Sequence, residues 1–222
     1  ALPAPTSVPL INHAYKQELP RRPQAAPAHK TAKYSPAQCQ AELRKRGIAV
    51  QRGRAAGVAT PVRLASPLQG VTFTAPGKRS VYGVLDCRLA LALDDFARIL
   101  ARHEVVRVRV DNMYRPRARL PGRKHKSQHA YGLAADVMSF ELSDGRVLLV
   151  EQDWQGAVGT PPCGPEARLQ AEVETAILLR NMICEVAREG LFNHLLTPSY
   201  DAAHRDHLHL DIKRDARDIS IN

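Results

Sequence analysis

The sequence predicts an α+β fold in which helices flank a small, mostly antiparallel sheet. Three patterns indicate it. After Asp86, apolar residues recur at helical spacing over residues 89–100, which places them on one buried helix face. Residues 105–110 instead alternate apolar and basic side chains, as a half-buried strand does. Apolar runs on both sides of Asp144-Gly145 indicate a hairpin, because this dipeptide suits tight turns.

The N-terminal residues 1–34 are rich in proline and alanine, with scattered basic residues. Proline removes backbone donors, and the stretch lacks helical or strand periodicity. We therefore predict a linker or tether over residues 1–34, parts of which can pack on the domain. A single domain is expected over residues 35–222, a usual size for one core.

The first helix of this domain is expected to begin at Pro36. Ser35 supplies the N-cap, Gln38 completes a capping box, and Gly47 ends the helix. Residues 48–85 are expected to form short strands and turns, because glycine and proline interrupt them repeatedly. Asp86 is the expected cap of the second helix.

The second half of the chain begins with a basic loop over residues 115–126 that leads to His129. The hairpin strands are expected at 133–142 and 146–151. A long helix is expected over 166–189, ended by Gly190, and a last strand over 206–213.

The composition bounds the class of partner. Lys and Arg number 32 against 22 acidic residues, giving a net charge of +10, which implies polyanionic surroundings. No nucleic-acid-binding motif is recognised, and aromatics are only 5%, too few for an evident stacking platform. We therefore expect no nucleic acid partner and an electrostatic contact with an anionic cell envelope. No apolar run approaches the ~20 residues of a membrane span.

The four cysteines lie far apart and form no C-x-x-C pair, which argues against a zinc ribbon or a thioredoxin-like site. Unpaired buried thiols are one interpretation. An even count beside a proline-rich start favours two disulfides and an oxidising compartment. The sequence allows three pairings, of which we predict Cys39–Cys87 and Cys163–Cys184.

Two stretches combine imidazole and carboxylate groups. Residues 127–136 contain His129 and Asp136, and residues 204–209 contain His207 and His209. A strand projects side chains two positions apart from the same face. A catalytic zinc takes three protein ligands and keeps a fourth position open. One histidine alone is usually an ordinary residue, but both stretches together predict a metal site, with zinc as the metal.

Asp136 supports this prediction, because it lies in an apolar stretch over residues 133–138. An unpaired buried carboxylate is costly there, and a metal relieves that cost. An ion pair with a nearby arginine is the alternative.

The same residues resemble the signature of a superfamily of zinc peptidases. The pattern S-x-H-x-x-G-x-A-x-D is matched over residues 127–136, and His207-Leu208-His209 matches its closing H-x-H. The superfamily includes lysostaphin-type endopeptidases, D-Ala-D-Ala metallopeptidases, penicillin-insensitive murein endopeptidases and the zinc domain of hedgehog proteins. Within it the chain is most similar to the bacterial extensin-like C-terminal family. That similarity rests on the cysteine placement, the run His-Arg-Asp-His-Leu-His-Leu-Asp and Trp154, and it covers roughly residues 35 to 213.

The resemblance implies a hedgehog/D-Ala-D-Ala-peptidase-like fold and a Zn²⁺ cofactor held by His129, Asp136 and His209. It implies that His207 is the general base. Other relatives use a carboxylate at the position of Asp206, so that choice stays open. His204, three residues before His207, is a further catalytic candidate that holds a proton or binds the peptide, unless it is an ordinary loop residue.

Arg115 is the third catalytic candidate, since many relatives carry a Tyr-Arg pair upstream of the zinc histidine. Its guanidinium would stabilise an oxyanion, often worth ~3 kcal/mol, or clamp a carboxylate. A solvated base is the alternative. Tyr131 and Ser127 are candidate substrate-binding residues, although Ser127 can instead bond the backbone of its turn. Trp154 either lines the cleft or packs in the core.

The function that the resemblance implies is a periplasmic or secreted peptidoglycan hydrolase. Zinc-bound water would attack stem-peptide or cross-link amides, as a D,D- or L,D-endopeptidase or carboxypeptidase. Spacing alone implies only metal-assisted hydrolysis. We expect a monomer that acts on peptidoglycan peptides. The alternatives are a non-catalytic zinc-containing envelope-binding module and a charge-driven binder of nucleic acid or lipopolysaccharide.

Overall fold

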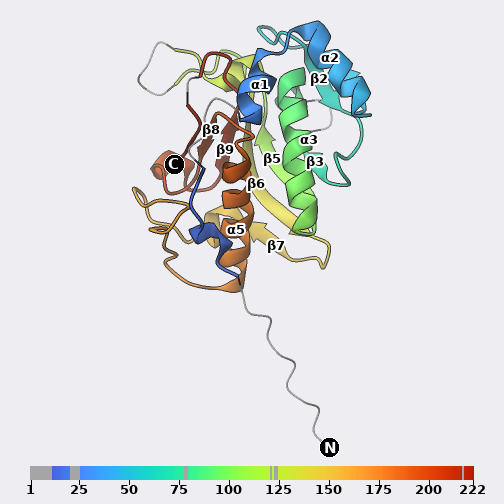
Figure 1. Ribbon diagram of the computed structural model, residues 1–222. Helices are drawn as coiled ribbons and strands as arrows, with labels where there is room; N and C mark the ends of the chain where they lie inside the picture. The colour runs from blue at the N-terminus through green and yellow to red at the C-terminus, as the bar shows by residue number, and fades with distance from the viewer. Residues whose placement is uncertain (1–11, 21–25, 78–79, 121, 123–124, 217) are drawn as a thin grey trace, which may run out of the picture.

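The structure is a computed structural model that describes residues 12–20, 26–77, 80–120, 122, 125–216 and 218–222 (Figure 1). Its main sheet has the strand order β10-β8-β9-β6-β5-β3, with β7 paired to β6. The central pairings are antiparallel, and the two outermost, β3 with β5 and β10 with β8, are parallel. The strands are β3 (Thr72–Thr74), β5 (Val105–Asn112), β6 (Ala134–Leu142), β7 (Val147–Leu149), β8 (His194–Leu196), β9 (Leu208–Asp211) and β10 (Ser220–Ile221).

A smaller antiparallel sheet has the order β1-β2-β4. Its strands are β1 (Val50–Arg52), β2 (Pro61–Leu64) and β4 (Leu85–Asp86). The helices are α1 (Pro27–Lys33), α2 (Pro36–Lys45), α3 (Cys87–Arg102), α4 (Val150–Asp153) and α5 (Glu174–Glu189). Helices and mainly antiparallel strands together confirm the α+β class.

One face of the main sheet is covered by α3 and α5, which lie side by side across it in Figure 1. Ala135 and Val137 of β6 and Leu208 and Leu210 of β9 belong to the resulting core. Side chains alternate between the two faces of a strand. The residues between these core positions, including Asp136 and His209, therefore point to the face opposite the helices.

The helix starts follow the local sequence. Ser35 and Gln38 form a capping box at the start of α2, and the Asp86 side chain accepts a hydrogen bond from Arg88 N at the start of α3. Gly190 ends α5 in the left-handed conformation. These boundaries confirm the predictions, because each depends on contacts within one helical turn.

The predicted start of the long helix is wrong. The helix α5 begins at Glu174 rather than at 166. The preceding residues turn instead: Ala167 N bonds Gly164 O, and Gln170 N bonds Gln155 O. Ala167 is buried beside the Cys163–Cys184 pair. Tertiary contacts thus use backbone groups that a longer helix would have needed.

The last two predicted strands are also shorter than predicted. The second hairpin strand stops at Leu149, after which α4 follows, and the last strand covers Leu208–Asp211 rather than 206–213. Residues 205 and 206 lie in a turn before β9, a difference that matters for the site.

Part of the N-terminal segment that was predicted as a tether packs on the domain. Ala28 and Ala32 of α1 belong to the main core, and Tyr15 is buried in a second cluster with Cys163 and Cys184. The folded unit therefore extends before the boundary at residue 35, while residues 1–11 and 21–25 lie outside the described residues.

Both predicted disulfides are present, Cys39–Cys87 and Cys163–Cys184. The first joins α2 to the start of α3, and the second joins the loop before α5 to α5 itself. No helix in the described part of the chain is long and apolar enough to cross a membrane.

Removing the two disulfides is expected to destabilise the protein unequally. They span 48 and 21 residues, and a longer closed loop restricts the unfolded chain more. We expect a Cys39→Ala/Cys87→Ala variant to lose about 4 kcal/mol of unfolding free energy and the Cys163→Ala/Cys184→Ala variant about 3 kcal/mol. Urea denaturation under oxidising conditions measures both. Equal stability of the variants and the parent would contradict the prediction.

Candidate metal centre

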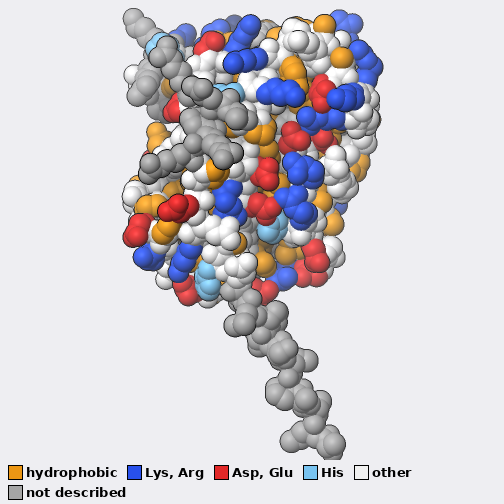
Figure 2. Space-filling view, viewed as in Figure 1, with side chains coloured by type: hydrophobic (Ala, Val, Ile, Leu, Met, Phe, Trp, Pro, Cys, Tyr) orange, Lys and Arg blue, Asp and Glu red, His pale blue; other side chains and the backbone are white. Residues whose placement is uncertain are grey.

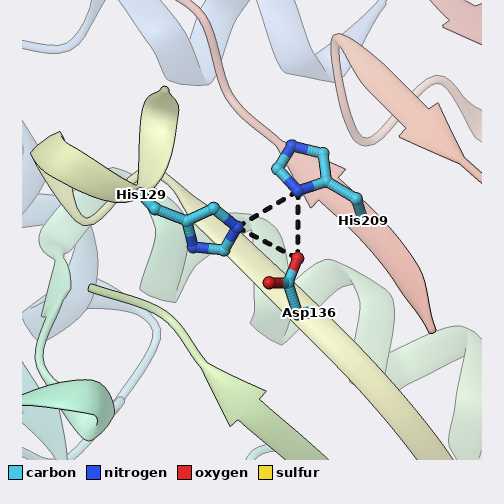
Figure 3. A group of neighbouring side chains, drawn as sticks. All are labelled: His129, Asp136 and His209. Carbon is cyan, nitrogen blue, oxygen red and sulfur yellow. Dashed lines mark hydrogen bonds and ion pairs between the residues drawn. The ribbon is translucent and has the colours of Figure 1, made fainter. Parts of the chain in front are cut away.

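Three side chains converge on the sheet face opposite the helices, as Figure 3 shows. His129 Nε2 lies 3.0 Å from Asp136 Oδ1 and 3.1 Å from His209 Nδ1, and His209 Nδ1 lies 3.0 Å from Asp136 Oδ1. The three atoms thus form a nearly equilateral triangle. Two imidazole nitrogens and one carboxylate oxygen at such distances can hold a metal ion.

The sheet register brings Asp136 and His209 together. Asp136 of β6 is the direct cross-strand partner of His209 of β9. Directly opposed residues on antiparallel strands have neighbouring side chains on the same face. The pairing register of the two strands therefore brings these residues together although they are 73 positions apart in the sequence.

His129 reaches the same point from a short 3-10 helix, η4 (Gln128–Tyr131). Ser127 caps this helix by accepting a hydrogen bond from His129 N, and Gly132 ends it at a φ of 63°. A Cβ atom on Gly132 would lie 2.9 Å from Asp86 N. Glycine is required there for conformation and for space, because η4 must lie directly against the start of α3.

Burial and hydrogen bonding determine which of the three side chains in the triangle is charged. Burial lowers the pKa of His129, which favours its neutral form. Burial would raise the pKa of Asp136, but hydrogen bonds with His129 and His209 outweigh it and hold that pKa well below its usual range. Burial would likewise lower the pKa of His209, but Asp136 and Asp211 raise it to about 9. The metal-free site thus carries an ionised Asp136 and a protonated His209 near neutral pH.

The donor set fits a zinc ion. Three atoms about 2.1 Å from one tetrahedral ion would lie about 3.4 Å apart, so the triangle needs to open by only a few tenths of an ångström. Asp211 Oδ2 lies 3.5 Å from His209 Nε2, the nitrogen that faces away from the triangle, where metal-binding histidines usually find an acceptor. His129 Nδ1 is buried and has no hydrogen-bond partner among the described residues.

His207 lies beside the triangle. Its Nε2 is 3.7 Å from Asp136 Oδ1, and its Nδ1 is 2.8 Å from Asp206 Oδ1. Asp206 reaches His207 because it lies in the turn before β9, and a regular strand would have directed it to the other face. The hydrogen bond with His207 lowers the pKa of Asp206, so a carboxylate holds the ring with Nε2 toward the site.

His204 forms a second pair of the same kind. Its ring lies 5.1 Å from the His207 ring, centroid to centroid, and its Nδ1 is 2.7 Å from Asp201 Oδ1. Asp201 also caps the short helix η5 (Ala202–His204). Both outer histidines thus have a neighbouring carboxylate on Nδ1.

The family model described as the extensin-like protein C-terminus matches residues 37–221, a range that contains every residue of the site. The chain belongs to the extensin-like C-terminus family. A search of curated proteins found no match.

The remaining candidate residues of this extensin-like chain have different surroundings. Arg115 Nη2 lies 4.0 Å from Asp136 Oδ2, and its side chain is 48% exposed, so it can reach both the site and solvent. Tyr131 is half-buried, with Lys126 Nζ 5.7 Å from its ring centroid. Ser127 is buried, and its hydroxyl faces His129 N. The structure therefore favours the turn-bonding role of Ser127 over contact with substrate.

Trp154 packs in the core of the extensin-like domain, as one of its two interpretations predicted. The guanidinium of the fully buried Arg180 stacks on it at 4.1 Å and donates to the carbonyls of Trp154 and Pro162. Burial lowers the pKa of Arg180 to about 10. Trp154 Nε1 donates to Ser199 Oγ, which ties this buried pair to the loop that leads to His204.

Sequence reasoning missed several polar partners of the site. Asn112 Nδ2 donates to Asp136 Oδ2, and His194 Nδ1 lies 2.9 Å from Asp211 Oδ1. Asn112 ends β5 directly opposite Asp136, so a longer predicted strand over residues 105–112 would have pointed to it. Nothing in the spacing of the sequence pointed to His194 or Asp201.

Zinc binding is expected to release at least one proton per chain at pH 7.5, one from His209 and a further fraction from a zinc-bound water. The pKa of His209, raised to about 9, means that zinc displaces a proton from this residue, whereas His129 and Asp136 have none to lose. Below pH 9 the proton on His209 by itself makes the apparent affinity rise about tenfold per pH unit. Calorimetric titration in two buffers of different ionisation enthalpy measures the proton count. A count of zero at pH 7.5 would contradict this assignment.

Proposed function

We propose that the protein is a zinc-dependent peptidoglycan hydrolase that acts outside the cytoplasm on stem-peptide or cross-link amide bonds. The observation that carries the proposal is the triangle of His129, Asp136 and His209 with His207 Nε2 directly beside it. Its motifs, S-x-H-x-x-G-x-A-x-D and H-x-H, resemble those of the lysostaphin, D-Ala-D-Ala peptidase and hedgehog superfamily. A peptidase-like fold of that superfamily is part of the proposal.

In the proposed mechanism His129, Asp136 and His209 would hold the zinc. When bound, the ion would supply Lewis acidity that makes a water molecule easier to deprotonate. His207 accepts a proton at Nε2 as the general base, and Asp206 holds its ring in that orientation and stabilises the imidazolium that forms. His204 lies close enough to His207 to accept a proton from it in a relay, or to contact the bound peptide.

Arg115 is assigned to the negative charge that develops on the scissile carbonyl oxygen. Its guanidinium lies at the edge of the triangle and remains exposed. A bound peptide can therefore contact it directly from the solvent side. Donors of this kind stabilise an oxyanion by ~3 kcal/mol. Tyr131, the last residue of η4, and Lys126, whose Nζ lies 5.7 Å from the Tyr131 ring centroid, are assigned to the peptide chain and its carboxylates.

The proposed location rests on two observations. Disulfides persist mainly in oxidising compartments, and both cysteine pairs of this chain are bonded. The net charge of +10 suits a negatively charged envelope polymer. Peptidoglycan combines such a location with peptide bonds next to free carboxylates.

Digestion of purified muropeptides tests the proposal. Monomers and dimers cross-linked by D,D- or L,D-bonds are incubated with the protein alone, with chelator, and with chelator followed by excess zinc. We expect loss of one cross-link or terminal-residue class, its block by chelator and its return with zinc. A protein that binds one zinc per chain but cleaves none of these species would overturn the enzyme and leave the zinc-containing binding module.

A further inference from the structure

A groove of about 900 Å³ lies between α2 and the small sheet, a volume in the range of ligand-binding clefts. In Figure 1, α2 lies over β2 at the upper right. None of the candidate metal-centre residues lines this groove. One wall is a face of α2 and the other is β1 with the loop into β2; the residues are Pro36, Gln40, Leu43, Arg44, residues 48–54 and residues 59–62.

The strand β1, which lines this groove, has a free edge. It is the outer strand of the order β1-β2-β4. The bonds from Ala65 N to Ala49 O and from Gly53 N to Pro61 O show that alternate residues of β1 bond to β2. The N–H and C=O groups of Val50 and Arg52 consequently point away from β2, and none of them has a backbone partner among the described residues. Such an edge can accept one more strand.

The positive charge of the groove indicates what kind of peptide would bind there as an added strand. Arg44, Arg52 and Arg54 line it and are exposed, and no acidic residue is among its lining residues. In the described part of the chain these arginines form no ion pair. Figure 2 shows Lys and Arg side chains gathered over α2 on the face in view. The floor between them is apolar, with Leu43, Ile48 and Val62 buried there.

The groove is also preformed. The Cys39–Cys87 disulfide joins α2 to the residue that follows β4. It therefore links covalently the helix and the small sheet that form the two walls of the groove. Arg46 of α2 pairs with Asp94 and Asp95 of α3. Little ordering is therefore required when a ligand binds, which favours affinity.

We propose that this groove binds an extended acidic peptide, which adds to β1 as a further strand. The peptide backbone bonds to the outward N–H and C=O groups of Val50 and Arg52. Its carboxylates meet the three arginines, and its apolar side chains cover the floor. This surface goes beyond the proposed hydrolase, because neither the contact nor its test involves the metal centre.

The test measures fluorescence anisotropy of a labelled peptide of alternating glutamate and valine, mixed with the full chain in excess chelator. We expect saturable binding that an Arg52→Glu/Arg54→Glu variant weakens by about tenfold or more. An Arg98→Glu/Arg109→Glu variant is the matched control, since both of these arginines are exposed, make no ion pair among the described residues and do not line the groove. Equal weakening of binding by both variants would show that the peptide binds only through non-specific electrostatic attraction, and it would overturn the proposal.

A second arm uses the unaltered protein and is independent of variant folding. The same peptide, N-methylated at alternate residues, keeps its charge but loses the donors that strand pairing needs. We expect this peptide not to bind. Undiminished binding of the N-methylated peptide, or equal binding of a sulfated glycan without peptide bonds, would exclude strand addition. Dependence of peptide binding on zinc would assign the peptide to the metal centre instead.

Discussion

Replacing Asp136 by asparagine is expected to abolish both zinc binding and the proposed hydrolysis. The substitution keeps the size of the side chain but removes the charge that joins the two imidazoles. Loss of a partner outside the ligand shell costs ~10–100-fold in metal affinity, so loss of a ligand should exceed that, by roughly 10³-fold or more. Zinc content after gel filtration and muropeptide cleavage measure the two effects.

The control for this variant is Asp144→Asn, which changes an exposed carboxylate in the turn between β6 and β7. Thermal melting in chelator checks that both proteins are folded. If Asp136→Asn still holds one zinc per chain at the parent affinity, Asp136 is not a ligand and the assignment of the centre is wrong.

A His207→Gln variant is expected to keep its zinc and lose ~10²–10⁴-fold in kcat. His207 is not part of the triangle, but its Nε2 lies next to Asp136. A base at this position can accept the proton that the attacking water releases. Zinc stoichiometry and steady-state cleavage of one muropeptide separate binding from catalysis. The control is His103→Gln, whose imidazole pairs with Glu185. Loss of zinc together with activity would instead make His207 a ligand.

An Asp206→Asn variant extends this prediction to the partner of His207. It keeps the base but removes the carboxylate that holds its Nδ1, so we expect a loss in kcat smaller than that of His207→Gln, with zinc content unchanged. In the double variant the two losses should not add, because one residue acts through the other. Full additivity, or a larger loss in Asp206→Asn than in His207→Gln, would make Asp206 the base.

The fold was most predictable where local contacts decide the conformation. Ser35 and Asp86 cap their helices as predicted, because a cap needs only the next two or three backbone N–H groups. The early start predicted for α5 failed because residues 163–173 bond to Gln155 and pack near Tyr15. Those partners come from distant parts of the chain, so no local pattern encodes them.

The residues of the candidate site likewise fall into those that the sequence predicted and those that only the tertiary structure revealed. The spacing within residues 127–136 and 204–209 predicted a metal site, and the resemblance to zinc peptidases selected His129, Asp136 and His209 as its ligands. The carboxylates beside the outer histidines were harder to predict. A strand was expected from residue 206, and such a strand would direct Asp206 to the face opposite His207, whereas the chain turns there. Asn112 and His194 belong to other strands, and only the sheet register places them at Asp136 and Asp211.

The sequence by itself thus determined the fold class, the helix caps and the identity of the three clustered side chains. It allowed three cysteine pairings, and the tertiary structure has the pairing that we predicted. Only the tertiary structure decided that Tyr15 and α1 pack on the domain, that Asp206 holds His207, and that β1 borders a basic groove. The physical reason is the range of the interactions. Caps and periodicity act within a few residues, whereas the pairing of Asp136 with His209 and the packing of α2 beside β1 depend on how distant segments share one sheet and one core.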